Sequence, residues 1–271
     1  MTAELPDASV SRPSALERLT AGKPVVALGV RNARGGDIAR MARGAGYDAL
    51  WIDLEHSAMP IDSAVLIAAT ARDLGMAAWV RVPERDYGVV GRLLDGGASG
   101  IIAPRIETVE EARTVVSAAR FAPRGQRSQI ALLPQFDFRR LPPGELNRQA
   151  DADTVVQILL ETERGIANAD AIAALDGVDI LGVGTNDLAA DLGCSGNPRD
   201  PRLTDACRRV AAAAARQGKL AVVGGVADSA HFRDLLQMGV APYIFAGIDT
   251  DILAGALVQR AFDGHALASP S

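Results

Sequence analysis

Residues 154–187 have the sequence TVVQILLETERGIANADAIAALDGVDILGVGTND, in which two short apolar runs flank a helical pattern. The runs are TVVQILLET (154–162) and DILGVGTND (179–187), and both contain the β-branched residues that strands favour. A strand, a helix and a second strand in this order predict a βαβ unit with parallel strands. Because both strands of such a unit end at the same edge of the sheet, Glu161 and Asp187 are expected to lie close together.

The same alternation extends on both sides of this unit, from Pro24 to the end of the chain. Six further runs follow the pattern: PVVALGV (24–30), DALWIDLEH (48–56), MAAWVRV (76–82), GIIAPRI (100–106), KLAVVGGV (219–226) and APYIFAGI (241–248). Eight strands in 271 residues predict a single α/β domain, a (β/α)8 TIM barrel. An open doubly wound sheet is the alternative, but it rarely needs eight repeats in series, and no glycine-rich dinucleotide fingerprint follows the first run.

The domain is expected to occupy residues 1–271, with residues 1–20 as a flexible arm and residues 265–271 as a tail. One connection does not fit the regular pattern. Residues 122–153 are far longer than a usual link and are rich in Pro, Arg and Gln. We expect this segment to form a lid or a contact in an oligomer.

The composition excludes several classes of partner. The net charge is −5, and the basic residues are scattered without a run that could follow a phosphate backbone, so nucleic acid is not expected as a partner. Cys194 and Cys207 form no CxxC pair, which argues against a disulfide framework or a zinc knuckle and fits a reducing cytoplasm. No apolar stretch is long enough for a membrane span, so we expect a cytoplasmic protein without a membrane partner.

The predicted strands end in polar side chains, and in a barrel the active groups lie at these carboxyl ends. The polar residues are Asp53, Glu55 and His56 after the second run, then Arg81, Arg105, Glu161 and Asp187 after the next four. Glu161 and Asp187 end consecutive strands, and two carboxylates supply the hard oxygen ligands that suit Mg²⁺ or Mn²⁺. Solvated strand ends or helix caps are the structural alternative for both residues.

His56 is the only histidine at the carboxyl end of a predicted strand, which excludes a three-histidine zinc site. An imidazole at this place is a candidate proton carrier, and Asp95, in the helix after Arg81, is a candidate to orient it. A histidine that only packs against its neighbours is the alternative. Arg81 is expected to hold a carboxylate or to stabilise a developing oxyanion. A structural ion pair with Asp53 or Glu55 is compatible with that role.

The positions of the lysines argue against one class of aldolase mechanism. Lys23 and Lys219 are the two lysines of the chain, and each precedes a predicted strand. Both are therefore expected at the amino end of the barrel, away from the active groups. A Schiff-base aldolase needs a lysine within the active site, so covalent imine catalysis is not expected.

The segments DLEH (53–56), WVRVP (79–83), LLET (159–162) and GVGTNDLAADLG (182–193) resemble the HpcH/HpaI aldolase family, the class II pyruvate aldolases. The resemblance extends from about Pro24 to Phe262 and includes the spacing of its polar residues: 25 residues from His56 to Arg81, 14 more to Asp95, and 26 from Glu161 to Asp187. The stretch from 103 to 127 is also similar to the fourth strand, the following helix and the Gly-Gln-Arg turn of the family.

The resemblance implies a fold, an assembly and a set of roles. The fold would be a barrel of the phosphoenolpyruvate/pyruvate type that exchanges its C-terminal helix within a homo-oligomer, a hexamer or another dimer-based assembly. A divalent metal ion, Mg²⁺ or Mn²⁺ with Co²⁺ as a further candidate, would be bound by Glu161 and Asp187. The remaining roles are Arg81 at the enolate oxygen, His56 with Asp95 as an acid/base pair, Asp53 among the catalytic residues, and Arg81, Gly184, Asn186 and Asp187 at the substrate.

Two positions depart from the family pattern. The family often has glutamine two residues before the metal-binding glutamate, whereas this chain has Leu159, which cannot hydrogen-bond a water or a substrate oxygen. The glycine-rich segment after Gly-Gln-Arg is replaced by SQIALL (128–133). Acceptor binding or the shape of the lid is therefore expected to differ from that of the family.

The leading hypothesis is a reversible aldol reaction between a pyruvate-type 2-oxo acid and an aldehyde, making or cleaving 4-hydroxy-2-oxo acids. The first alternative is a lyase acting on malyl- or citryl-type acyl-CoA thioesters, whose nucleotide phosphates would need basic residues such as Arg124, Arg127, Arg139 and Arg140. The second is a barrel that has lost catalysis and serves as a binding or scaffold protein.

Overall fold

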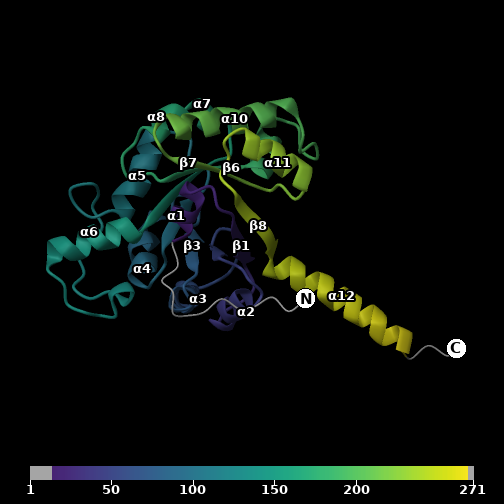
Figure 1. Ribbon diagram of the computed structural model, residues 1–271, viewed down its shortest axis with the longest axis horizontal. Helices are drawn as coiled ribbons and strands as arrows, with labels where there is room; N and C mark the ends of the chain where they lie inside the picture. Colours follow the sequence, from purple (N-terminus) through teal and green to yellow (C-terminus); the bar gives the residue numbers. More distant parts are fainter. Residues whose placement is uncertain (1–13, 268–271) are drawn as a thin grey trace.

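Eight parallel strands form a nearly closed barrel in the computed structural model, which describes residues 14–267 (Figure 1). The strands are β1 (Val25–Val30), β2 (Ala49–Asp53), β3 (Ala77–Arg81), β4 (Gly100–Ala103), β5 (Val155–Leu160), β6 (Ile180–Gly184), β7 (Leu220–Gly224) and β8 (Tyr243–Ile248). Each falls within one of the eight predicted runs, so the barrel prediction is confirmed. The strand order is β7-β6-β5-β4-β3-β2-β1-β8. At the seam between β7 and β8, the amide of Ala241 donates a hydrogen bond of 2.7 Å to the carbonyl of Ala221.

Most of the helices connect successive strands and cover the outside of the barrel; the first and the last helix of the chain do not. They are α1 (Ala15–Thr20), α2 (Asp37–Gly44), α3 (Ile61–Asp73), α4 (Val90–Asp95), α5 (Val109–Ala119), α6 (Pro143–Asp153), α7 (Glu163–Ala167), α8 (Ala169–Ala173), α9 (Thr185–Asp191), α10 (Pro201–Arg216), α11 (Ser229–Gln237) and α12 (Asp249–Leu267), with the 3-10 turns η1 (Tyr87–Val89) and η2 (Pro134–Phe136).

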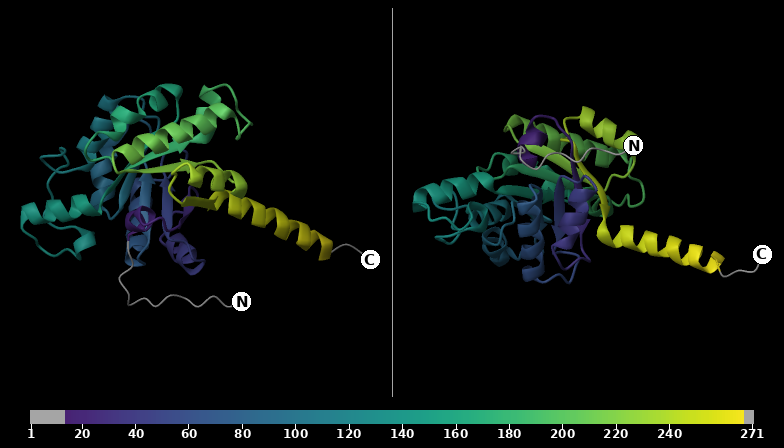
Figure 2. Two further views of the ribbon diagram at one scale, coloured as in Figure 1. Left: turned by 45° about the horizontal axis from the view of Figure 1, so that its top comes forward. Right: turned by 60° about the horizontal axis from the view of Figure 1, so that its bottom comes forward.

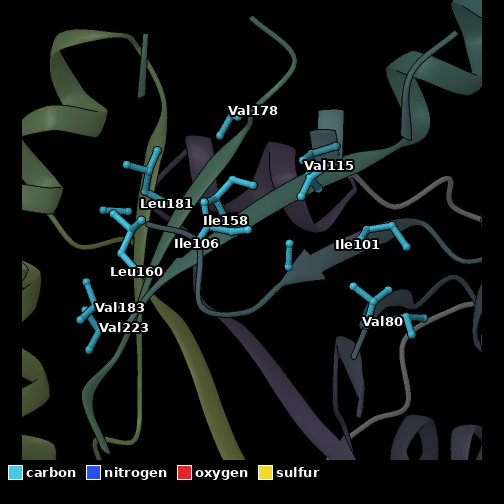
Figure 3. Packing of buried hydrophobic residues seen from close by; sticks show 14 of the residues in the cluster. Val80, Ile101, Ile106, Val115, Ile158, Leu160, Val178, Leu181, Val183 and Val223 are labelled. Carbon is cyan, nitrogen blue, oxygen red and sulfur yellow. The ribbon is translucent and has the colours of Figure 1, made fainter. Parts of the chain in front are cut away.

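Strand residues alternate between two apolar layers. Residues such as Ile158, Leu160, Leu181 and Val183 belong to the outer layer, where they pack against the helices (Figure 3). Their chain neighbours form the inner layer, whose members include Trp51, Trp79, Ile102, Leu159, Val222 and Tyr243. Because side chains along a strand point alternately to its two faces, this division fixes which residues face the barrel interior. The same alternation continues to the strand ends and determines which polar groups point inward there.

Helix α1 lies against the amino end of the barrel. Ser14 and Glu17 form a capping box at its start, and Leu19 is 2% exposed within the inner apolar layer. The expectation of a flexible arm is therefore wrong for residues 15–20, because Ala15 and Leu19 supply a buried face that the sequence pattern of a six-residue helix does not reveal. Residues 1–13 lie outside the described residues. At the other end, the expected tail is helical as far as Leu267, and residues 268–271 also lie outside the described part.

The segment from 122 to 153 contains η2, α6 and a small apolar group of its own, formed by Phe121, Leu133, Leu146 and Ala150. It begins after α5 and ends before β5, and both of these points lie at the amino end of the strands. None of its residues lines the cavity at the carboxyl end. The segment therefore does not form a lid over the mouth of its own barrel, since the chain has already returned to the opposite end, whereas its role as an oligomer contact stays a prediction.

Helix α12 extends away from the barrel in every view (Figures 1 and 2). All of its side chains from residue 251 onward are exposed, including the large apolar side chains of Ile252, Leu253, Leu257, Val258, Phe262 and Leu267, which are 47–90% exposed. Strand β8, which precedes it, is also the least buried strand of the barrel. A helix packed on β8 would normally cover this strand in a TIM barrel, but α12 does not fold back onto it.

Two exclusions from the sequence can be compared with the structure. Cys194 and Cys207 are both buried, and neither forms a disulfide. Among the helices of residues 14–267, none combines the length and the apolar character that a membrane crossing requires.

We expect Leu19→Ala to lower the free energy of unfolding by about 2–5 kcal/mol, the usual cost of removing a buried leucine side chain. Equilibrium urea unfolding measures this value. Leu16→Ala is the control, because Leu16 lies on the same helix but is only half-buried and should cost less. Equal and negligible effects of both changes would mean that α1 does not pack against the barrel.

Candidate active site

A cavity of about 590 Å³ opens at the carboxyl ends of the strands; we call it the mouth cavity. Its lining includes Arg31, Trp51, His56, Arg81, Gln157, Leu159, Glu161, Gly184, Thr185, Asn186, Asp187, Gly224, Phe245, Ile248 and Asp251. A second cavity of about 430 Å³ lies at the amino end beside α1. Its charged side chains pair with one another, Arg18 with Asp48 and Arg72 with Asp153. The mouth cavity is therefore where the polar strand ends converge.

Alternation along the strands turns the polar side chains toward the barrel interior at its carboxyl end. Asp53, Arg81 and Glu161 have the same phase as the interior residues Trp51, Trp79 and Leu159 that lie two positions before them. Asp53 and Arg81 are also direct neighbours in the parallel register of β2 and β3. All three residues therefore lie at the carboxyl end of the barrel, and Arg81 and Glu161 line the mouth cavity.

Asp53 is fully buried and holds two guanidinium groups. Its Oδ1 accepts a hydrogen bond of 3.0 Å from Nε of Arg81, and its Oδ2 accepts one of 2.7 Å from Nη2 of the same residue. Oδ2 also accepts a bond of 2.6 Å from Nε of Arg31. Burial alone would raise the pKa of Asp53, but the hydrogen bonds and positive charge of Arg81, helped by Arg31, lower it overall. Asp53 does not line the cavity, so its position is that of a residue that orients the arginines.

Arg81 is tied to a second carboxylate as well. Its Nη1 lies 2.8 Å from Oε2 of Glu55, and its guanidinium carbon lies 4.5 Å from the centre of the Trp51 ring. Burial raises the pKa of Glu55, although the charge of Arg81 opposes this shift. The structural pairing expected as an alternative for Arg81 is therefore present, and the same side chain still lines the mouth cavity.

His56 lines the cavity with its side chain 53% exposed, so it is not a packing residue. Its Nε2 lies 3.7 Å from Oε2 of Glu55, which is its nearest acidic neighbour in the ion pairs of the described residues. The structure does not bring Asp95 to His56. Asp95 is the last residue of α4, at the amino end of the barrel, where it accepts a hydrogen bond of 2.7 Å from Nη2 of Arg127. A helix that follows a strand begins at the carboxyl end of the barrel and ends at the amino end. Within one chain, Asp95 and His56 therefore lie at opposite ends of the barrel.

Glu161 is 3% exposed and is held by the backbone around it. Its Oε2 accepts a hydrogen bond of 2.9 Å from the amide of Arg105, a residue in the left-handed region with φ 51°. Burial raises the pKa of Glu161 to about 7, the Arg105 amide opposes the shift, and the negative charge of Asp187 adds to it. A carboxylate in this position is stabilised by a cation, because a cation offsets both the burial and the repulsion from Asp187.

Asp187 lies in the first turn of α9, and its side chain is 49% exposed. Its Oδ1 lies 3.9 Å from Nη1 of Arg105, so both acidic residues contact Arg105, Glu161 through the backbone amide and Asp187 through the side chain. Asn186 lines the cavity beside it. The described residues contain no group of three His, Cys, Asp or Glu side chains that could enclose a metal ion. Two carboxylates with open positions fit Mg²⁺ or Mn²⁺, which retain water and bind substrate oxygens.

Gly184 makes room for Glu161. A Cβ atom at this position would lie 2.2 Å from Oε1 of Glu161. The sequence prediction assigned Gly184 to substrate binding, and the residue does line the cavity, but the contact that requires glycine is the one with Glu161. Lys219 lies at the amino end of the barrel, where the sequence predicts it, and its Nζ donates a hydrogen bond to the carbonyl of Leu175.

Three features of the site escaped the sequence prediction. Arg31 follows β1 directly, one position beyond the run that was taken as the strand, and the strand-end rule would have included it. Glu55 was placed among the polar strand ends and as a possible partner of Arg81 but was not assigned to the site, whereas it contacts Arg81 and also approaches His56. Gln157, two residues before Leu159, is 2% exposed and lines the cavity, and its Oε1 has no hydrogen-bond partner among the described residues. The barrel interior therefore does contain a side-chain amide, but it lies two residues before Leu159 and thus further from the carboxyl end of the strand.

We expect Gly184→Ala to displace the Glu161 carboxylate and to weaken Mn²⁺ binding about 10- to 100-fold, the range seen when groups that support metal ligands are changed. Titration calorimetry with Mn²⁺ measures the affinity. Gly224→Ala is the matched control, because Gly224 is the register partner of Gly184 on β7 and an added Cβ there meets nothing closer than 3.5 Å. If the two variants bind Mn²⁺ as tightly as the unchanged protein, Glu161 is not a ligand.

Comparison with known proteins assigns the chain to a family. Residues 32–255 match the model of the HpcH/HpaI aldolase/citrate lyase family. The chain is 36% identical over 241 residues to a 4-hydroxy-4-methyl-2-oxoglutarate aldolase of Hapsidospora irregularis, with 88% of this chain and 89% of the relative covered. It is also 36% identical over 223 residues to a 4-hydroxy-2-oxovalerate aldolase of Rhodococcus jostii, with 80% and 82% covered.

A solved structure agrees with this assignment. The crystal structure of an HpcH/HpaI aldolase from Desulfitobacterium hafniense superimposes with a TM-score of 0.84 at 27% identity, covering 95% of this chain and 98% of the other. The chain belongs to the HpcH/HpaI aldolase/citrate lyase family.

Proposed function

We propose that this chain is a divalent-metal-dependent aldolase that forms and cleaves the bond between C3 and C4 of 4-hydroxy-2-oxo acids. The observation that carries the proposal is the pair of carboxylates, Glu161 and Asp187, beside Arg81 in a cavity that contains no lysine. The names of the relatives from H. irregularis and R. jostii support the same reaction class.

Glu161 and Asp187 would hold the cation, with Mg²⁺ or Mn²⁺ as the first candidates and Co²⁺ as a further one. When bound, such a cation polarises the carbonyl of a 2-oxo acid and makes its C3 protons more acidic. Glu161 lines the mouth cavity and the side chain of Asp187 is half-exposed, so both groups can be reached by a cation that enters from solvent. Gly184 keeps the space in which the Glu161 carboxylate lies.

The remaining steps belong to Arg81 and His56. Arg81 would donate a hydrogen bond to the ketone oxygen of the 2-oxo acid, on which negative charge develops in both directions of the reaction. Asp53 and Glu55 fix the guanidinium in place before the substrate arrives, which reduces the reorganisation needed in the transition state. In cleavage, His56 would take the proton of the C4 hydroxyl group, and in synthesis it would return a proton to the acceptor oxygen.

The acyl-CoA lyase alternative receives less support. Its candidate phosphate-binding residues lie in the segment from 122 to 153, at the opposite end of the barrel from the mouth cavity. Arg124 pairs with Asp151, and Arg127 is buried against Asp95. A barrel without catalytic activity is also disfavoured, because such a barrel has no reason to keep two arginines and two carboxylates in a buried network at its mouth.

The activity should depend completely on a divalent cation. Exhaustive chelation with EDTA is expected to abolish cleavage of 4-hydroxy-2-oxo acids, and Mg²⁺, Mn²⁺ or Co²⁺ should restore it, because the two carboxylates alone cannot polarise the carbonyl. A coupled assay that detects the released 2-oxo acid measures both effects. Cleavage that continues undiminished after chelation would exclude the proposed role of Glu161 and Asp187.

We also propose that the protein is a homo-oligomer in which pairs of chains exchange α12. The apolar side chains of this helix are distributed around its whole circumference, a pattern typical of helices that are buried on several sides. The under-covered outer face of β8 on a second copy offers a place for it. A dimer-based assembly such as a hexamer would follow, and the buried free thiols fit a cytoplasmic location.

Phe262→Asp should dissociate this assembly, because Phe262 is 71% exposed in the isolated chain and would be buried in the exchanged helix. Size-exclusion chromatography with light scattering is expected to show a smaller mass for this variant. Gln259→Lys is the control, since it adds a charge at a polar position of the same helix, where the neighbouring Asp263 can still accept a hydrogen bond, and it should leave the mass unchanged. A monomeric unchanged protein would contradict the exchange of α12.

A further inference from the structure

Arg31 occupies a defined place at the mouth cavity. It is the first residue after β1 and continues the interior phase of Val25 and Ala27, so its side chain turns toward the barrel interior. Its guanidinium lines the mouth cavity, and its carbon lies 5.7 Å from the centre of the Trp51 ring. The side chain is 27% exposed, which leaves it accessible to a ligand in the cavity.

The backbone that carries Arg31 is fixed by a residue from the other end of the chain. Asp249, at the start of α12, accepts hydrogen bonds of 2.8–3.1 Å from the amides of Arg31, Asn32 and Ala33. Nη1 of Arg34 donates to the carbonyls of the same three residues. Arg31 is therefore held in position before any ligand binds, which lowers the entropic cost of recognition.

The two arginines at the mouth differ in the donors that remain free. All three nitrogens of the Arg81 guanidinium lie against carboxylate oxygens of Asp53 or Glu55. Arg31 uses only Nε, which donates to Asp53, and within residues 14–267 no hydrogen bond engages its Nη1 or Nη2. Two terminal nitrogens with free N–H groups form the fork that binds a carboxylate through two parallel hydrogen bonds.

We propose that Arg31 binds a carboxylate of the acceptor, so that the preferred acceptor is a carbonyl compound that itself carries a carboxylate. This inference rests on the proposed aldolase function and specifies its second substrate. The bond formed joins C3 of the 2-oxo acid to the acceptor carbonyl carbon, the C3 proton is lost, and the acceptor oxygen gains a proton. Cleavage reverses these changes, so the substrate for cleavage is a dicarboxylic 4-hydroxy-2-oxo acid.

The named relatives do not decide this point. Cleavage of 4-hydroxy-4-methyl-2-oxoglutarate releases two 2-oxo acids, whereas cleavage of 4-hydroxy-2-oxovalerate releases one 2-oxo acid and a neutral aldehyde. The two relatives that carry these names are both 36% identical to this chain. The free N–H groups on Nη1 and Nη2 of Arg31 favour the first type of product.

The test compares glyoxylate with acetaldehyde as acceptors, two aldehydes that differ by a carboxylate in place of a methyl group. Aldol addition is measured with saturating pyruvate and Mn²⁺ for the unchanged protein, Arg31→Met, Arg31→Lys and the control Arg40→Leu. Arg40 is exposed on α2 and carries the same charge as Arg31. Thermal unfolding is recorded for each variant, so that loss of folding is recognised.

The unchanged protein should prefer glyoxylate. Arg31→Met is expected to lower kcat/KM for glyoxylate at least about 10-fold more than kcat/KM for acetaldehyde, mainly through KM, because hydrogen bonds to a charged group are lost. Arg31→Lys should retain part of the preference, since it keeps the charge without the fork, and Arg40→Leu should change neither value.

Three results would overturn the proposal. Equal loss of activity toward both acceptors in Arg31→Met would mean that Arg31 only supports Asp53, and the aldolase function would stand without the acceptor site. Absence of Mn²⁺-dependent addition to either acceptor by the folded, unchanged protein would instead remove the proposed function and the inference together. A preference that survives intact in Arg31→Met would also contradict the assignment.

Discussion

The buried carboxylate of Asp53 determines how the mouth of this barrel is arranged. A fully buried charge is costly unless it is paired and hydrogen-bonded, and Asp53 meets this condition by binding Arg81 through two nitrogens and Arg31 through one. The hydrogen bonds therefore fix the direction of both guanidinium groups. Without this carboxylate, Arg31 would lose the acid that its Nε binds and Arg81 would keep Glu55 as its acidic partner, so the two cations beside Trp51 would be less firmly held.

The position of Glu161 depends on free space at the interior face of β6. Gly182 and Gly184 carry no side chains, and the side chains of β5 occupy the room they leave: Leu159 and Gln157 beside Gly182, and Glu161 beside Gly184. A buried acidic residue is thus placed at the cavity wall by its neighbour's lack of a Cβ atom. The cost of this arrangement appears as the raised pKa of Glu161, which a bound cation would offset.

The sequence predicted the barrel and most of the site because both follow from short-range patterns. Alternation within each strand and the common carboxyl edge of parallel strands are enough to bring Arg81, Glu161 and Asp187 together. Asp95 was expected beside His56 but lies at the opposite end of the same barrel. Spacing along the chain does not show at which end of the barrel a helical residue lies. The fixed position of Arg31 could not be foreseen either, since it depends on Asp249, which is 218 residues away.

Glu161 and Asp187 are proposed to bind one divalent cation beside Arg81. A crystal structure of the protein with Mn²⁺ and pyruvate, with an anomalous difference map, tests this most directly. We expect one manganese peak coordinated by both carboxylates, with pyruvate oxygens completing its shell and Arg81 next to the ketone oxygen. A peak elsewhere in the barrel, or pyruvate bound in the mouth cavity without manganese at these two residues, would contradict it.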